Sequence, residues 1–95
     1  MTFVLTVRWV AKEGEEARVE HALRQLVEPS RAEAGCREYR PSRDPEDARV
    51  FFIYEEYDDK AAYEAHGATE HFERWGVGEA FPLLESRERA FYETL

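Results

Sequence analysis

Several common features are missing from this 95-residue chain, and each absence excludes a class of protein. It contains one cysteine, Cys36, so it cannot form an internal disulfide, which fits a reducing compartment. No histidine or lysine adjoins Cys36 to lower the pKa of its thiol, which predicts a small apolar strand residue rather than a nucleophile. The chain has no basic leader with a small-residue cleavage site and no run of roughly 18 apolar residues. We therefore expect a cytoplasmic protein.

Basic residues are also too few for a nucleic-acid or membrane-surface protein. The 13 basic residues against 21 acidic ones give a net charge of -8, which repels phosphate backbones and anionic lipid. No G-x-G-x-x-G or P-loop is present to hold a nucleotide, and no serine has a nucleophile-elbow context. Two arginines alternate along the last apolar segment, Arg87 and Arg89. Such arginines are mostly solvated or ion-paired, although one could orient an anionic substrate.

The apolar patterning predicts six elements in the order β-α-β-β-α-β. Asp58 or Asp59 is expected to cap the second helical region, which Gly67 and Thr69 divide into two parts. Gly76 and Gly78 are expected to open a loop. The predicted elements are a strand over 3–11, a long helix that starts after Gly14, is disturbed at Pro29 and stops at Gly35, strands over 36–43 and 49–57, a helical region from 58, and a strand over 86–95. This order is that of an α+β ferredoxin-like fold with a four-stranded antiparallel sheet.

Both faces of that sheet are predicted to be apolar. In the first strand Leu5, Val7 and Trp9 alternate with Val4 and other apolar side chains on the opposite face. Two helices cover only one face, and each large side chain left in water costs roughly 1.5 to 3 kcal/mol. A second identical chain can cover the other face, so we expect a homodimer with sheet against sheet.

The stretch EAHGATEHF places His66 and His71 five residues apart. On an unbroken helix they would diverge by about 140°, and no cysteine and only the nearby glutamates could complete a metal site, so no metal is expected. Solvated or packed histidines are the ordinary alternative. The apolar company of Tyr63, Phe72 and Trp75 instead favours the wall of a cavity, where a histidine can exchange a proton near neutral pH.

Four segments together resemble the antibiotic biosynthesis monooxygenase (ABM) domain family, including its quinol monooxygenase-like members. They are VLTVRWVAKEG, LVEPSRAEAGC, RVFFIYEEYDDKAAYEAH and TEHF. The similarity spans nearly the whole chain, so residues 1–95 are expected to be one ABM-like domain. It implies a dimeric α+β barrel that oxidises a small aromatic, quinol- or polyketide-like substrate with molecular oxygen and without a cofactor.

On this resemblance His66 and His71 are the candidate catalytic residues. Five aromatic residues are the candidates for shaping a substrate pocket between sheet and helices: Trp9, Tyr54, Tyr63, Phe72 and Trp75. The haem-degrading branch of the family relies on an asparagine of the first strand, and this chain contains no asparagine. Two alternatives use the same pocket: a non-catalytic module that binds a small hydrophobic ligand, and an isomerase or degradation enzyme for a small signalling metabolite.

Overall fold

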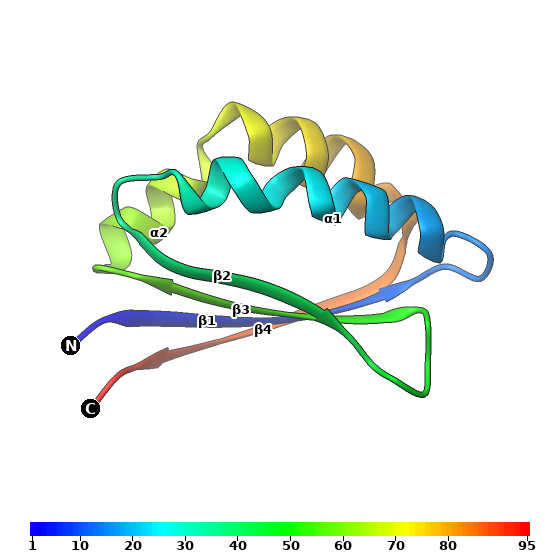
Figure 1. Cartoon of the computed structure of the whole chain (residues 1–95), viewed down its shortest axis with the longest axis horizontal. Helices are drawn as coiled ribbons and strands as arrows, with labels where there is room; N and C mark the ends of the chain where they lie inside the picture. Colours follow the sequence, from blue (N-terminus) through cyan, green and yellow to red (C-terminus); the bar gives the residue numbers. More distant parts are fainter.

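Four antiparallel strands form one sheet, and all the helices lie on one of its faces (Figure 1). The computed structural model describes all 95 residues. The strands are β1 (Phe3–Ala11), β2 (Cys36–Arg43), β3 (Val50–Tyr57) and β4 (Leu84–Glu93), in the spatial order β2-β3-β1-β4. The helices are α1 (Glu16–Arg31), α2 (Lys60–Gly67), the π-helix η1 (Phe72–Ala80) and the short 3₁₀ segment η2 (Phe81–Leu83). This is the predicted ferredoxin-like α+β fold.

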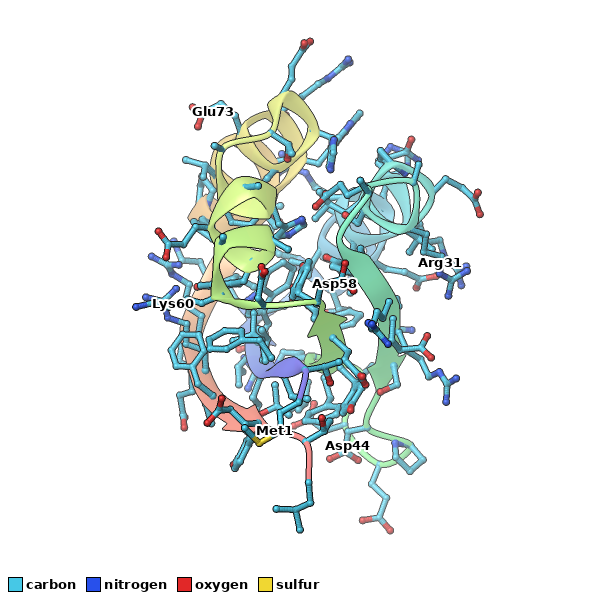
Figure 2. All side chains as sticks on the ribbon, turned by 90° about the vertical axis from the view of Figure 1, so that its left-hand side faces the viewer. Met1, Arg31, Asp44, Asp58, Lys60 and Glu73 are labelled. Carbon is cyan, nitrogen blue, oxygen red and sulfur yellow. The ribbon has the colours of Figure 1, made fainter.

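The core lies between the sheet and the helices. The β1 residues Leu5, Val7 and Trp9 are buried there, together with Phe51 and Ile53 from the neighbouring β3. From above, α1 contributes an apolar stripe at helical spacing: Val19, Ala22, Leu23 and Leu26. Seen end-on, α1 and η1 lie side by side above the sheet (Figure 2), and they contact each other. None of these helices has the length and apolar content that crossing a membrane requires.

Two predicted features of the helices were wrong in detail. Pro29 does not interrupt α1, which continues through it to Arg31. The Gly76–Gly78 segment is not a loop but lies inside η1. A side chain at position 76 would meet the ring of Phe72 at 3.1 Å, so that glycine permits close packing within the helix. The sequence alone does not distinguish a glycine needed for close packing from a glycine needed for a turn.

The opposite face of the sheet carries no helix. Phe52 on β3 and Tyr92 on β4 lie on this face and keep 43% and 57% of their surface exposed. Val4 of β1, paired with Tyr92 and with Glu56 of β3, is buried on the same face although no helix covers it. The alternation predicted from the sequence is therefore present, and one of the two apolar faces is open to solvent.

A glycine brings the end of α1 against α2. The Cα of Gly35 lies so close to Ala62 of α2 that a methyl group at position 35 would collide with the Ala62 side chain. The carbonyl of Gly35 also accepts a hydrogen bond from the Asp58 amide at 2.9 Å. Together these contacts fix the segment that contains Glu33 above the start of α2.

We predict that Gly35→Ala destabilises the protein by roughly 1 to 3 kcal/mol, because the added methyl group overpacks this contact. The Gly35→Ala/Ala62→Gly double variant should recover most of the loss. Gly67→Ala is the matched control, since a methyl group there meets no atom within 4 Å. Urea denaturation measures all three. Equal stability of wild type and Gly35→Ala would contradict the proposed contact.

Candidate functional site

A pocket of about 400 Å³ opens between the sheet and the segment formed by α2, η1 and η2. Its floor is the helix-facing side of β1, where Leu5, Val7 and Trp9 lie in a row. The rest of the lining is aromatic or titratable: Tyr39, Glu55, Tyr63, His66, Gly67, Phe72, Phe81, Arg87, Glu88 and Arg89. The pocket therefore combines an apolar floor with a few polar groups at its walls, as small-molecule sites do.

His66 is the imidazole that reaches this pocket, and Glu33 holds it in place. The His66 side chain is only 3% exposed, and its Nδ1 lies 2.8 Å from Oε2 of Glu33. A carboxylate has only acceptor atoms, so Nδ1 carries the proton and donates it. The other ring nitrogen, Nε2, is then left with its lone pair, and it lies 3.8 Å from Oε1 of Glu55.

His71 reaches the same carboxylate from the other side. Its Nε2 lies 2.6 Å from Oε2 of Glu33, and the two imidazole rings are 6.1 Å apart. His71 does not line the pocket. The two histidines of EAHGATEHF therefore converge on one glutamate, and only His66 can touch a molecule in the pocket.

The predicted break at Gly67 and Thr69 brings the two histidines together. The Thr69 hydroxyl donates to the carbonyl of His66 at 2.8 Å and accepts from the amide of Phe72 at 3.2 Å. Thr69 therefore ends α2 and caps the turn that leads into η1. Because the chain changes direction at this turn, the His66 and His71 side chains point to the same carboxylate, which they could not do on one continuous helix.

Glu55 is a buried carboxyl group beside the pocket. It is 4% exposed, and its Oε1 accepts a hydrogen bond from the Tyr57 hydroxyl at 2.6 Å. Burial raises the pKa of Glu55 to about 7, with the charge of Glu33 adding to the effect and the Tyr57 hydrogen bond opposing it. A carboxyl group that titrates near neutral pH beside an imidazole can exchange protons with it.

Burial acts on His66 in the opposite sense. Loss of solvent lowers the pKa of His66, although the hydrogen bond and charge of Glu33 oppose that shift. The imidazole is therefore neutral at pH 7 and available as a base. For Cys36, burial and the charges of Glu33 and Glu55 raise the pKa to about 11, so this thiol stays protonated, in agreement with its predicted inert role.

Glu33, His66 and His71 are also the residues that could hold a metal ion, because their ligand atoms lie within 4.8 Å of one another. The glutamate of this group is not one of those adjacent to the histidines in the chain but Glu33, in the turn that follows α1. Two imidazoles and a carboxylate are ligands that zinc accepts. The same three atoms satisfy one another by hydrogen bonds, so metal binding would replace the proton network rather than add to it.

The structure brings together four of the seven residues expected at the site. Trp9, Tyr63, His66 and Phe72 line the pocket, and His71 lies behind His66. The other two lie elsewhere: Tyr54 is on the open face of the sheet, and Trp75 packs against His21 of α1. Alternation along β3 already separates Tyr54 from its pocket-facing neighbour Glu55.

Three polar groups of the site had no sequence signal strong enough to identify them. They are Glu33, Glu55 and Tyr39, whose ring lies 5.7 Å from that of His66. Glu55 offered the clearest hint, because it stands in the core-facing phase of β3 with Phe51 and Ile53. An ionisable residue in such a phase is rare without a partner or a function.

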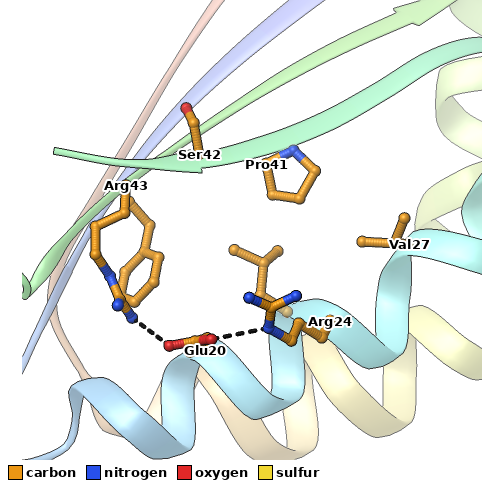
Figure 3. A pocket seen from close by; sticks show the side chains of 8 residues that line it. Glu20, Arg24, Val27, Pro41, Ser42 and Arg43 are labelled. Carbon is orange, nitrogen blue, oxygen red and sulfur yellow. Dashed lines mark hydrogen bonds and ion pairs between the residues drawn. The ribbon is translucent and has the colours of Figure 1, made fainter. Parts of the chain in front are cut away.

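A second hollow of about 180 Å³ lies between α1 and β2 (Figure 3). Its charged groups are all engaged in ion pairs, since the single carboxylate, Glu20, binds Arg24 at 2.8 Å and Arg43 at 2.7 Å. Phe51, which also lines this hollow, is part of the hydrophobic core. This hollow offers neither a free charge nor a titratable group in a dry environment.

The model of the family described as "Antibiotic biosynthesis monooxygenase" matches residues 2–76. No curated protein matches the chain. Among solved structures, PA3566 from Pseudomonas aeruginosa is 39% identical with a TM-score of 0.91, over 99% of this chain and 94% of that one. The crystal structure of an antibiotic biosynthesis monooxygenase is 28% identical over 98% of both chains, with a TM-score of 0.91. SO0527 from Shewanella oneidensis is 27% identical, over 96% of this chain and 88% of that one, with a TM-score of 0.88.

The match to the family model covers most of the chain, and the overall fold agrees closely with that of the solved structures. The chain belongs to the antibiotic biosynthesis monooxygenase family. Some members of this family are monooxygenases, and fold alone does not fix the activity of a given member. The chemistry of this chain therefore depends on the residues of its own pocket.

We predict that Glu55→Gln is more stable than wild type at pH 8 and that this advantage disappears toward pH 4.5. In the folded wild type the pKa of Glu55 is about 7, against 4.5 for a free glutamate. The unfolded chain therefore ionises first, and the protein loses stability as pH rises from 4.5 to about 7. The full difference is on the order of 3 kcal/mol. Glutamine keeps the acceptor for Tyr57 and never ionises.

Urea denaturation at pH 5, 6, 7 and 8 measures this difference. Comparing the variant with wild type at each pH removes the opposing contribution of His66, whose lowered pKa adds stability as pH rises. Glu73→Gln, on the exposed side of η1 (Figure 2), is the control and should show a difference independent of pH. A pH-independent difference for Glu55→Gln would contradict the buried-acid assignment.

Proposed function

We propose that this protein is a monooxygenase that oxidises a small, electron-rich aromatic substrate, such as a quinol or naphthol, in the pocket beside His66. The observation that carries the proposal is one neutral imidazole that is oriented by Glu33, lines a pocket with an apolar floor, and leaves its Nε2 without a hydrogen bond. Membership of the family supports the reaction class. The pocket supports the substrate class, because Trp9, Tyr63 and Phe72 line it and aromatic rings pack favourably on a flat aromatic molecule.

The first step is removal of a proton from the substrate hydroxyl by Nε2 of His66. The resulting imidazolium is stabilised through Nδ1 by the Glu33 carboxylate. His71 donates to the same carboxylate and so holds it in place, which makes His71 a positioning residue rather than a catalytic one. This arrangement resembles other catalytic sites in which a base is oriented by a third group.

Deprotonation makes the aromatic ring electron-rich enough to reduce molecular oxygen. One electron passes to O₂, the two radicals combine to form a C–O bond at a ring CH₂ or its tautomer, and the peroxide takes the proton back from His66. Loss of the second carbon-bound proton and cleavage of the O–O bond then give a carbonyl group and water. The substrate supplies all the electrons, so CH₂ plus O₂ becomes C=O plus H₂O. Glu55 beside Nε2 can relay these protons.

We further propose that the active form is a homodimer in which the open sheet faces of two chains pack together as a dimeric α+β barrel. Phe52 and Tyr92 would be removed from water there, at roughly 1.5 to 3 kcal/mol for each large side chain. The charged residues of this face have both signs, with Arg8 and Arg40 beside acidic neighbours. A two-fold axis can therefore bring opposite charges together.

We predict that His66→Ala lowers the catalysed rate of oxygen uptake by at least about 100-fold, because a positioned general base contributes that much or more. His71→Ala should cause a smaller loss, since Glu33 keeps its bond to His66. The measurement is oxygen consumption with a panel of hydroquinones and naphthols, corrected for uncatalysed oxidation in buffer.

His21→Ala is the matched control, because His21 packs against Trp75 outside the pocket and its loss should leave the rate unchanged. Treatment of the wild type with EDTA should also leave the rate unchanged. No uptake with any substrate, despite binding, would favour a non-catalytic module. Full activity of His66→Ala would refute the assigned base, and loss of activity with EDTA would favour a metal at Glu33.

We predict that wild-type protein has twice the chain mass of 11.2 kDa in solution and that Phe52→Glu halves it. A carboxylate in the centre of the packed faces would be buried without a partner. Light scattering at micromolar concentration measures the mass, and circular dichroism checks that the variant is folded. Val77→Glu, an exposed apolar residue on the helical side, should remain dimeric. A wild-type monomer would rule out this interface.

A further inference from the structure

The mouth of the pocket contains two arginines whose charges are not neutralised. Arg87 and Arg89 lie on β4, opposite Trp9 and Val7 in the strand register, and so face the helical side of the sheet. Arg87 stacks on the ring of Phe81, with its guanidinium carbon 3.8 Å from the ring centroid. Arg89 donates to the Tyr63 hydroxyl at 2.7 Å.

Four arginines of this chain form no ion pair, namely Arg31, Arg74, Arg87 and Arg89, and only the last two line the pocket. Seven other arginines form ion pairs within 4.0 Å: Arg8, Arg18, Arg24, Arg37, Arg40, Arg43 and Arg49. Glu88 also lines the pocket, but its ion pair is with Arg8. The two pocket arginines therefore keep most of their donor groups free, and stacking on aromatic rings fixes where those donors lie.

The free arginines and the base stand at opposite ends of the pocket. Arg87 and Arg89 are on β4, whereas His66 lies against Tyr39 and Tyr57 of β2 and β3. Strand β1 separates β4 from β3, so the backbones of these two strands are two strand spacings apart, about 10 Å. The Trp9 and Val7 side chains form an apolar floor between them.

We propose that Arg87 and Arg89 bind the carboxylate of a two-ring aromatic hydroxy acid whose hydroxyl group, at the far end of the molecule, reaches His66. A guanidinium binds a carboxylate through two parallel hydrogen bonds, and two guanidiniums at one mouth select an anion over a neutral ring. A monoanion fits better than a phosphate dianion, because Glu55, Glu88 and the net negative charge of the chain repel the larger charge. The proposal rests on the proposed function in taking this pocket as the substrate site.

The test is calorimetric titration without oxygen, using probes that bind and do not turn over. We expect 6-hydroxy-2-naphthoate to bind wild type roughly ten- to hundredfold more tightly than 2-naphthol, as charge-assisted hydrogen bonds would give. Arg87→Gln/Arg89→Gln should abolish this preference by weakening binding of the acid at least tenfold more than binding of 2-naphthol. The isomer 3-hydroxy-2-naphthoate, with adjacent groups, should bind more weakly than 6-hydroxy-2-naphthoate.

Arg74→Gln is the matched control, since Arg74 is exposed on η1, stacks on Trp75 and lies outside the pocket. It should keep the full preference for the acid. Equal affinity of wild type for acid and naphthol, no binding of either, an unchanged preference in the double variant, or an equal loss in Arg74→Gln would each overturn the proposal. Because the titration contains no oxygen, it tests binding alone. A failed oxygen-uptake assay would therefore count against the oxygenase chemistry and not against the binding of the acid.

Discussion

One carboxylate, that of Glu33, holds the candidate site together. Its Oε2 accepts from His66 at 2.8 Å and from His71 at 2.6 Å, so it determines both the tautomer of His66 and the direction of the free Nε2. Without that bond the buried imidazole would have no partner for Nδ1 and no fixed orientation. The pocket supplies an apolar environment, and Glu33 fixes the orientation of the one base within it.

The sequence predicted the fold well because fold information is local and periodic. Alternation in β1 and β3, the helical stripe of α1 and the Asp59 cap each depend on residues within a few positions of one another. The break at Thr69 was predictable for the same reason. The π-helical path through Gly76 was not, because it depends on the packing of the Phe72 ring against a glycine backbone.

The site was only half predictable, because its polar groups come from three separate segments. The pattern identified His66, His71 and several aromatic residues through their clustering along the chain. Glu33 follows the end of α1, more than 30 residues before the histidines, and its role depends on the approach of Gly35 to Ala62. Tyr54 and Trp75 were expected at the pocket from their residue type alone, and their side chains lie in other parts of the molecule.

The hydrogen bonds that His66 and His71 make to Glu33 span 33 and 38 positions of the chain. Contacts of such long sequence separation close large loops, so this network exists only when α1, α2 and η1 are all docked on the sheet. A ligand that binds the pocket then discriminates against every partly unfolded form, not only against the fully unfolded chain. By linkage, pocket occupancy should protect the entire domain from proteolysis, including segments far from the bound molecule.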